Sequence, residues 1–284
     1  MPRRLLTVVL ACVACEDVSL PAATPDAATS DAGGDSSVAP DDSGPVDGGA
    51  DASTCSAPDA GGLGIPCCAQ DPSLTFCSDF EPMNLFDPSP PWTAAWILVT
   101  PYAGGHAERD AQFAWGTGAA KFWSDGTDGG GLPAKAALRR QLGMKSGKTA
   151  LHVAFDLHVE EFPHGGGDLY FTSIPFGADA AYTIALLVNT AGVLTLGQQI
   201  GTNAFTKTTL TTITSGSWHH VELDAATATQ GDVVVRVDGT AKTTAMTVAP
   251  PAGDDPTLQI GLLYCDNGCG TYTLRFDDVV ASLK

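Results

Sequence analysis

The stretch Ser217–Gly239, SWHHVELDAATATQGDVVVRVDG, decides the fold, because it has the pattern of a β-hairpin. Its first half alternates apolar with acidic residues, and its second half places Val233, Val235 and Val237 between Val234, Arg236 and Asp238. A period of two is typical of strands with one buried face. The segment between the halves is small and polar, and Asp238-Gly239 is a turn dipeptide. The stretch therefore predicts two antiparallel strands joined by a longer loop.

The same alternation recurs outward from this hairpin. It is clearest in Ala150–Glu160, where five apolar residues alternate with His152, Ala154, Asp156, His158 and Glu160. Further strands are expected at 76–80, 92–99, 112–115, 119–123, 135–142, 168–174, 182–188, 193–199, 208–214, 241–248, 257–264 and 272–283. Glycine and proline separate most of them, and no segment has a helical stripe. The pattern predicts an all-β, antiparallel two-sheet β-sandwich.

Four short segments carry a resemblance to a known fold family. Trp218-His-His-Val followed by the valine strand resembles the central hairpin of laminin-G-like and concanavalin A-like lectin/glucanase jelly rolls. Leu258-Gln-Ile-Gly261 resembles the next strand, and Phe276-Asp-Asp-Val-Val280 resembles the closing strand. Phe76-Cys-Ser-Asp-Phe-Glu81 resembles the opening strand, which the family places beside the closing one. The resemblance spans Leu74 to Lys284 and implies a jelly-roll sandwich.

Residues 1–15 have the features of an export signal. Two arginines precede the apolar run Leu5–Ala14, which is too short to span a bilayer. The run ends in small residues before Cys15, and Cys12 has a similar context, so the segment resembles a bacterial lipobox. We expect lipidation at Cys15 (or Cys12) and an extracytoplasmic protein anchored to a bacterial membrane, facing the periplasm or the cell surface. An ordinary cleaved signal peptide is the alternative.

Residues 16–62 are expected to be a disordered linker before a folded domain at 63–284. The linker is rich in Asp, Ala, Gly, Ser and Pro and has ten acidic but no basic residues, so it cannot bury enough apolar surface to fold. As a flexible chain it spans roughly 40 Å, which suits a tether. The net charge of −18 also disfavours nucleic acid as a partner. Calcium or a neutral or basic ligand fits better, and an anionic polysaccharide would need a local basic patch.

Six further cysteines favour disulfides, because an exported chain meets an oxidising environment. Cys265 and Cys269 flank a tight turn and are the preferred pair. For the others we prefer Cys55 with Cys67 and Cys68 with Cys77, although the sequence leaves other pairings open. Their spacing does not favour zinc.

Acidic residues on the first and last strands predict a calcium site. If these strands pair, Asp79, Glu81, Asp277 and Asp278 bring hard oxygen ligands together. Related jelly rolls hold structural calcium near this point. The alternative is two acidic strand ends in water.

Outward residues of two strands form the predicted ligand site. His152, Asp156 and His158 share one face of their strand, and Trp218 and His220 share one face of the hairpin. In a jelly roll this side would line a concave groove for sugars, and a histidine with a carboxylate is capable of acid–base chemistry. A polar solvent-facing surface is the plainer alternative. His219 is expected to point toward the core. Trp92, Trp96 and Tyr170 are candidates for stacking on sugars.

The favoured function is a non-enzymatic, carbohydrate-binding domain. The paired glutamates expected of a retaining glycosidase are absent, since the adjacent Glu160 and Glu161 face opposite sides of a strand. A polysaccharide lyase or divergent glycosidase remains one alternative, and a structural or adhesive module the other. The conceivable lyase set is Arg139, Gln141, His152 or His158, and Tyr170 or Tyr272.

Overall fold

A computed structural model describes the chain over residues 76–78, 80, 96–102, 104–112, 118–126, 135–143, 147–177, 180–227, 229–251, 255–265 and 269–284. All of them lie in the compact unit Ser53–Lys284. The strands are β1 (Phe76–Ser78), β2 (Ile97–Tyr102), β3 (Gly105–Asp110), β4 (Ala119–Asp125), β5 (Lys135–Gln141), β6 (Ala150–Glu161), β7 (Leu169–Phe176), β8 (Tyr182–Val188), β9 (Val193–Ile200), β10 (Thr206–Thr212), β11 (Trp218–Ala226), β12 (Asp232–Val237), β13 (Thr240–Ala245), β14 (Thr257–Cys265) and β15 (Thr271–Leu283). Within these ranges no helix has the length and apolar character needed to cross a membrane.

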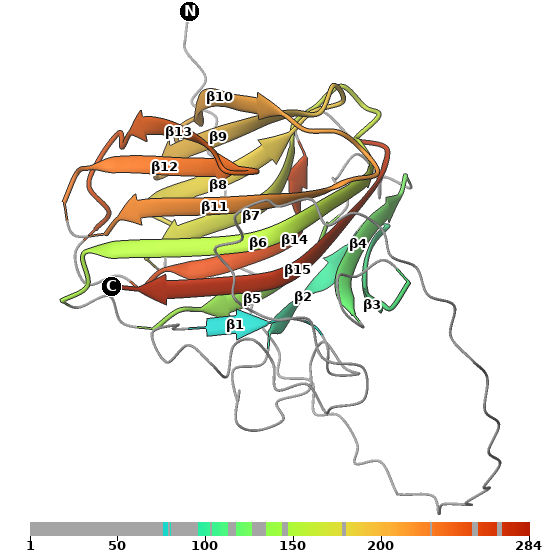
Figure 1. The fold of residues 1–284 in the computed structure, drawn as a ribbon, viewed down its shortest axis with the longest axis horizontal. Coiled ribbons are helices and arrows are strands. Elements are labelled where there is room, and N and C mark those ends of the chain that lie inside the picture. The colour runs from blue at the N-terminus through green and yellow to red at the C-terminus, as the bar shows by residue number, and fades with distance from the viewer. Residues whose placement is uncertain are drawn as a thin grey trace, which may run out of the picture. The chain divides into compact units, whose positions relative to one another are not determined.

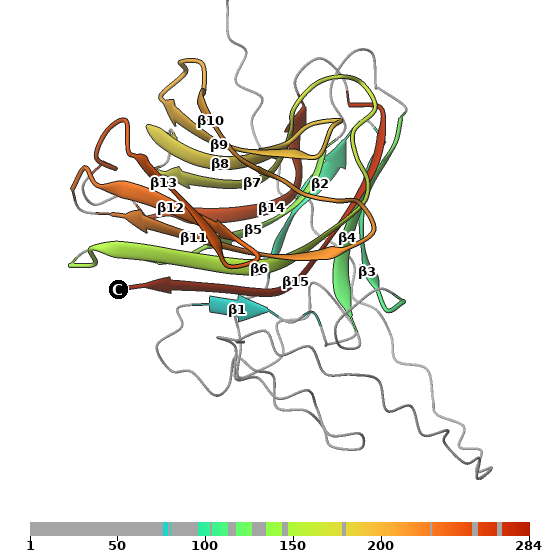
Figure 2. The same cartoon turned by 45° about the horizontal axis from the view of Figure 1, so that its top comes forward.

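The strands form two antiparallel sheets packed face to face, as the sequence predicts. Sheet A has the order β13-β12-β11-β6-β15-β4-β3, with β1 also paired to β15. Sheet B has the order β10-β9-β8-β7-β14-β5-β2. Figure 1 looks onto sheet A with sheet B behind it, and Figure 2 separates the two layers. This is the predicted all-β sandwich.

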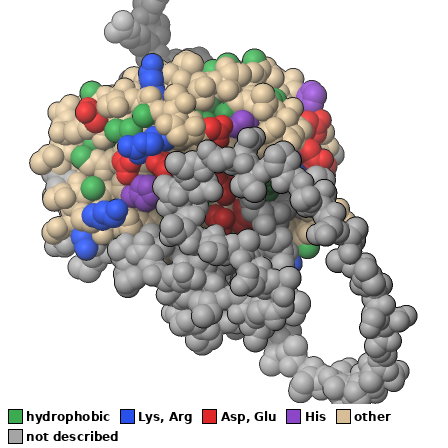
Figure 3. Space-filling model, viewed as in Figure 1, with side chains coloured by type: hydrophobic (Ala, Val, Ile, Leu, Met, Phe, Trp, Pro, Cys, Tyr) green, Lys and Arg blue, Asp and Glu red, His purple; other side chains and the backbone are tan. Residues whose placement is uncertain are grey.

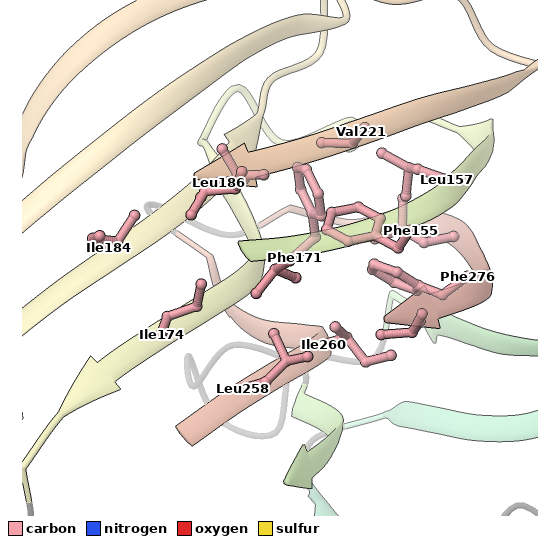
Figure 4. Close-up of a cluster of buried hydrophobic side chains, with 14 of the residues drawn as sticks. Phe155, Leu157, Phe171, Ile174, Ile184, Leu186, Val221, Leu258, Ile260 and Phe276 are labelled. Carbon is pink, nitrogen blue, oxygen red and sulfur yellow. The ribbon is translucent and has the colours of Figure 1, made fainter. Parts of the chain in front are cut away.

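The core fills the space between the sheets, because each strand turns its apolar residues inward. Phe155 of β6, Phe171 of β7 and Phe276 of β15 meet at its centre, with ring centroids 5.4–6.5 Å apart. Val221 of β11 and Ile260 of β14 pack around them (Figure 4). All five side chains are fully buried. A fully buried phenylalanine or aliphatic side chain contributes roughly 1.5–3 kcal/mol to folding.

The opening strand lies beside the closing strand, as the family resemblance implies. Phe76 pairs with Ala281 and Ser78 pairs with Val279, in antiparallel register. The β15 ladder is interrupted by a register shift between Asp277 and Val280, and Asp278 there has a φ of 45°. Aspartate tolerates this left-handed conformation better than most residues.

Most strand predictions hold, but β3 was not predicted and a strand at 112–115 is not supported. The sequence of β3, Gly-His-Ala-Glu-Arg-Asp, is polar. This suits its place at the edge of sheet A, where most of its side chains are only partly buried. The expected strand at 112–115 begins at Gln112, which lies in a bend, and the rest of that stretch is outside the described residues. Polar edge strands lack the alternation on which sequence prediction depends.

The edge strands on the other side of the sandwich are β10 and β13. Both are threonine-rich and largely exposed, and each carries one lysine, Lys207 and Lys242. The β10 ladder also shifts register between Thr209 and Thr211.

Candidate functional site

The predicted ligand residues come together on the outer face of sheet A. The β6–β11 register places His158 opposite Trp218, Asp156 opposite His220 and His152 opposite Asp224. The neighbouring residues Leu157 and Phe155 are in the core, so this row faces outward. Figure 3 shows acidic, basic and histidine side chains side by side on this face.

These side chains form a continuous ionic network across β6, β11 and β12. His152 Nδ1 lies 2.8 Å from Asp224 Oδ1, and His220 Nδ1 lies 2.7 Å from Asp156 Oδ1. Arg236 then contacts both Asp224 and, at 3.2 Å, Glu222. Each charge therefore has an opposite charge or a histidine beside it, which leaves few groups on this face dedicated to a ligand.

His220 is the most exposed histidine of the network. The hydrogen bond with the Asp156 carboxylate raises the pKa of His220, against the opposing effect of partial burial, and Glu222 raises it further. Below this pKa the ring is an imidazolium held between two carboxylates.

His158 is not an open ligand group. It is buried at 5% exposure, and the Trp218 ring lies 5.3 Å from it. Burial lowers the pKa of His158, and the neighbouring Arg275 guanidinium lowers it further, so the ring is neutral at pH 7. His158 and Trp218 therefore act together as packing on this face.

His219 points inward as predicted. Its Nδ1 donates to Asp238 Oδ2 at 2.7 Å, and its Nε2 lies within 3.2 Å of the Thr214 backbone. It is a satisfied histidine that fixes the turn after β12.

A second charged cluster on sheet A surrounds Arg275, which is 2% exposed. Its Nε donates to Asp110 Oδ2 at 2.8 Å and its Nη1 to Glu160 Oε2 at 2.7 Å. Burial alone would raise the pKa of Asp110, but hydrogen bonds from the Gln112 backbone and from Arg275 lower it below its usual value. This cluster ties β15 to β3 and β6.

The residues predicted to bind calcium are described only in part. Asp277 is buried, and its Oδ1 accepts a hydrogen bond from the Asp278 backbone. Asp79 and Glu81 lie outside the described residues, although β1 ends next to this bulge. Among the residues that the structure describes, no three or more His, Cys, Asp or Glu side chains are grouped as metal ligands. Calcium remains a prediction.

The conceivable lyase set does not assemble. Arg139 and Gln141 are on β5 in sheet B, whereas His152 and His158 are on β6 in sheet A. Tyr272 is buried in the core. No single groove can contain these groups.

The tryptophans considered for sugar stacking give no platform in the described part of the chain. Trp96 is 5% exposed and packs against Phe76 and Phe80. Trp92 lies outside the described residues.

The sequence indicates Tyr170 as a stacking candidate, but it does not reveal the aromatic cluster that surrounds Tyr170 on the outer face of sheet B. Tyr170 of β7 pairs with Tyr264 of β14, with ring centroids 5.4 Å apart, and Phe205 lies 5.0 Å from Tyr170. The cluster rests on Ala185 and Leu187 of β8 and is separate from the main core. Tyr264 is 50% exposed. We name Tyr170, Phe205 and Tyr264 the aromatic platform.

A glycine makes this packing possible. A Cβ atom added at Gly197 of β9 would come within 2.8 Å of the Phe205 ring and 3.0 Å of Leu187. Only a residue without a side chain lets Phe205 lie this close to the sheet. Gly197 is visible in the sequence, but its role depends on a contact with Phe205, which lies in the segment that precedes β10.

Polar groups border the aromatic platform on sheet B. Lys207 Nζ lies 5.6 Å from the Tyr170 ring and 2.8 Å from Asp168 Oδ2. Further along the same face, Gln259 of β14 pairs with Arg139 and with Ser173. Gln259 pairs with Ser173 and Tyr264 pairs with Tyr170, and these two partners are three residues apart on β7, which corresponds to roughly 10 Å. An extended ligand could thus meet aromatic and polar groups along one strand.

The predicted disulfide between Cys265 and Cys269 is present. It follows Tyr264 directly, so it holds the end of β14 where the aromatic platform lies. Cys12, Cys15, Cys55, Cys67 and Cys68 lie outside the described residues, as does the side chain of Cys77. Their lipidation or pairing remains a prediction.

Comparisons with known proteins identify the fold. No protein-family model matches the sequence, and no curated protein matches it. An endo-β-1,4-glucuronan lyase from the fungus Trichoderma reesei has a TM-score of 0.52 and 14% identity, over 65% of this chain and 90% of the lyase. The cellulose-induced protein Cip1 has a TM-score of 0.54 and 15% identity, over 73% and 96%.

A third similar structure is botulinum neurotoxin type C, whose cell entry is described as dependent on two ganglioside molecules. It has a TM-score of 0.52 and 8% identity, over 74% of this chain and 47% of the toxin chain. At these identities the comparisons show the fold alone. The chain has a jelly-roll sandwich, the fold that these proteins share.

Proposed function

We propose that this protein is a carbohydrate-binding domain whose ligand lies on the outer face of sheet B. The observation that carries the proposal is the aromatic platform, where the exposed Tyr264 ring is backed by Tyr170 and Phe205. Aromatic rings present a large apolar face at little cost in conformational entropy, and tyrosine adds a polar hydroxyl. This combination suits the alternating apolar and hydroxyl surfaces of a sugar ring.

The polar groups of the same face fit the rest of a glycan chain. Arg139, Gln259 and Ser173 line one row, and Lys207 and Asp168 flank the platform. Arg139 and Lys207 supply the local basic character that an anionic chain needs on a domain of net negative charge. The similarity in fold to the glucuronan lyase and to the ganglioside-dependent toxin supports a carbohydrate as the class of ligand, but it does not indicate which sugar.

We favour binding over catalysis. The groups considered for a lyase are divided between the two sheets. The histidines of sheet A are bound to carboxylates or buried. A lyase or glycosidase remains the second candidate, and it predicts depolymerisation of whichever glycan binds.

We also propose that the domain is exported and attached to a membrane through lipidated Cys15 (or Cys12). The apolar leader and the acidic linker support this placement, since a tether of roughly 40 Å would hold the sandwich away from the bilayer. Labelling of cells with a radioactive fatty acid should mark the protein, and Cys15→Ser with Cys12→Ser should abolish the label.

Binding is tested with a glycan array, followed by titration calorimetry of each glycan that binds. Tyr264→Ala should weaken affinity at least tenfold, because stacking on one aromatic ring contributes about 1.4 kcal/mol or more. The exposed position of Tyr264 means that the thermal unfolding midpoint should stay near that of the wild type.

Trp218→Ala is the matched control, because it removes an aromatic ring from the predicted site on sheet A. It should leave affinity within twofold. Loss of binding in Trp218→Ala but not in Tyr264→Ala would move the site to sheet A. No glycan binding by the wild type, with calcium and with chelator, would contradict the proposed function and favour an adhesive, protein-binding module.

A further inference from the structure

We infer that sheet A carries a second carbohydrate-contact site, at the corner where β3, β4, β15 and the end of β6 meet, and that it takes a neutral or amino-bearing pyranose on Trp123. The ligand class rests on the proposed function. The site itself is distinct, since it lies on the opposite sheet from the aromatic platform.

One row of outward side chains crosses these four strands. His106 pairs with Trp123, Trp123 with Thr273, and Thr273 with Glu161. Phe122 beside Trp123 is fully buried, so the indole must point to the outer face. Trp123 is partly exposed there.

The indole is held in a fixed orientation by groups supported from β3. The His106 ring stacks on Trp123 with centroids 4.8 Å apart and planes 16° apart. Lys121 Nζ lies 4.9 Å from the indole centre and is bound to Glu108 Oε1 at 3.1 Å. Because His106 and Glu108 both belong to β3, whereas Thr273 of β15 pairs with Trp123 from the other side, we place the ligand on the side of the indole toward β15.

Glu161 forms the opposite wall of this corner. Its Oε1 accepts a hydrogen bond from Thr271 Oγ1 at 3.3 Å and lies 2.8 Å from His164 Nε2. Since β4 and β6 are both neighbours of β15, they are roughly 10 Å apart. A sugar ring stacked on Trp123 would lie above Thr273, with its hydroxyl groups within reach of Glu161 and Thr271.

Charge selects the kind of sugar. The side chains of Asp125 and Glu161 are each at least two-fifths exposed and contact the histidines His106 and His164. Lys121 is paired with Glu108, so these two charges offset each other. An acidic rim repels uronates and attracts the ammonium group of an amino sugar. The two sites would therefore prefer different sugars.

Two sites on opposite sheets would let one domain join two glycan chains. A polysaccharide that engages both sites at once would bind with a higher effective affinity than either site provides alone.

The test uses the full-length protein labelled with 5-fluorotryptophan, in which Trp123→Phe assigns the Trp123 fluorine resonance among the five tryptophans. Cellohexaose and a glucosamine hexamer are the two probes. We expect both to shift this resonance, and we expect the shift to persist in Tyr264→Ala. Glu161→Gln keeps the side-chain shape and should weaken the glucosamine hexamer at least threefold more than cellohexaose.

The two proposals can fail separately. If the Trp123 resonance does not move while binding still depends on Tyr264, the second site is overturned and the proposed function stands. If the shift disappears in Tyr264→Ala, there is one site, and the inference is overturned. If the shift occurs and Tyr264→Ala changes nothing, the second site stands and the aromatic platform is not the ligand site.

Discussion

The outer faces of the two sheets follow the same strand pattern but differ in chemistry. On sheet A, charged side chains from neighbouring strands contact each other, as in the network from His152 to Arg236 and the cluster around Arg275. On sheet B, aromatic rings pack on small and aliphatic residues, and Tyr264 stays half exposed. Many charged groups on one face therefore need not mark a ligand site, because their contacts with one another can be mainly structural.

The largest effect is expected from Arg275→Met on sheet A. The change leaves the Asp110 carboxylate, whose side chain is only 10% exposed, without its cation, and breaking a largely buried ion pair from one side costs about 3–5 kcal/mol. Urea unfolding at pH 7 measures this loss. Arg236→Met is the matched control, since Arg236 and its partners are partly exposed, and it should cost less than about 1 kcal/mol. Equal losses in the free energy of unfolding would show that greater burial does not make the Arg275 ion pairs more stabilising than those of Arg236.

Calcium should have the next largest effect, through the β1–β15 edge of sheet A. If the ion binds the native state only, calcium at a hundred times its dissociation constant adds about 2.7 kcal/mol to the free energy of unfolding. Thermal unfolding with calcium and with EDTA measures the difference, and Asp277→Asn should abolish it. Identical midpoints in the wild type would rule out a structural calcium site.

A smaller effect is expected from the pH dependence of the His220 pair. The pKa of His220 is raised in the folded state, so its stabilisation is fully present below the unfolded pKa of about 6.5 and is lost as pH rises through the folded pKa. His220 is exposed and Asp156 is partly buried, so the contribution of the pair is below about 1 kcal/mol. The urea midpoint of the wild type should lie above that of His220→Gln at pH 5.5, and this difference should be smaller at pH 8.5. A constant difference would mean that titration of His220 contributes nothing.

The smallest effect on stability is expected from Lys207→Met on sheet B. Its ion pair with Asp168 is partly exposed and contributes about 0.5 kcal/mol or less. The same change should weaken binding of a uronate-containing glycan a few fold while sparing a neutral one, which calorimetry measures. A large loss of stability would remove the contrast between the two faces.

The sequence predicts the sandwich because alternation in β6, β11 and β12 is strong, and it predicts which side chains share the outer face of β6 and β11. It does not predict that His158 is buried beside Trp218 and Arg275, because that arrangement joins three strands. The aromatic platform was missed for the same reason. Tyr264 and Phe205 meet at Tyr170 only through long-range pairing with register shifts in β7 and β14. The polar edge strand β3 carries no alternation from which it could be found.

The edge strands β10 and β13 have a consequence for crowding. Exposed edges of a sheet can pair with the edges of other molecules, and lysines or bulges oppose this association. β10 contains Lys207 and a register shift, and β13 contains Lys242. Joining of sheets through β10 or β13 between neighbouring copies is therefore disfavoured, so the protein could reach high concentration without aggregating through these two edges.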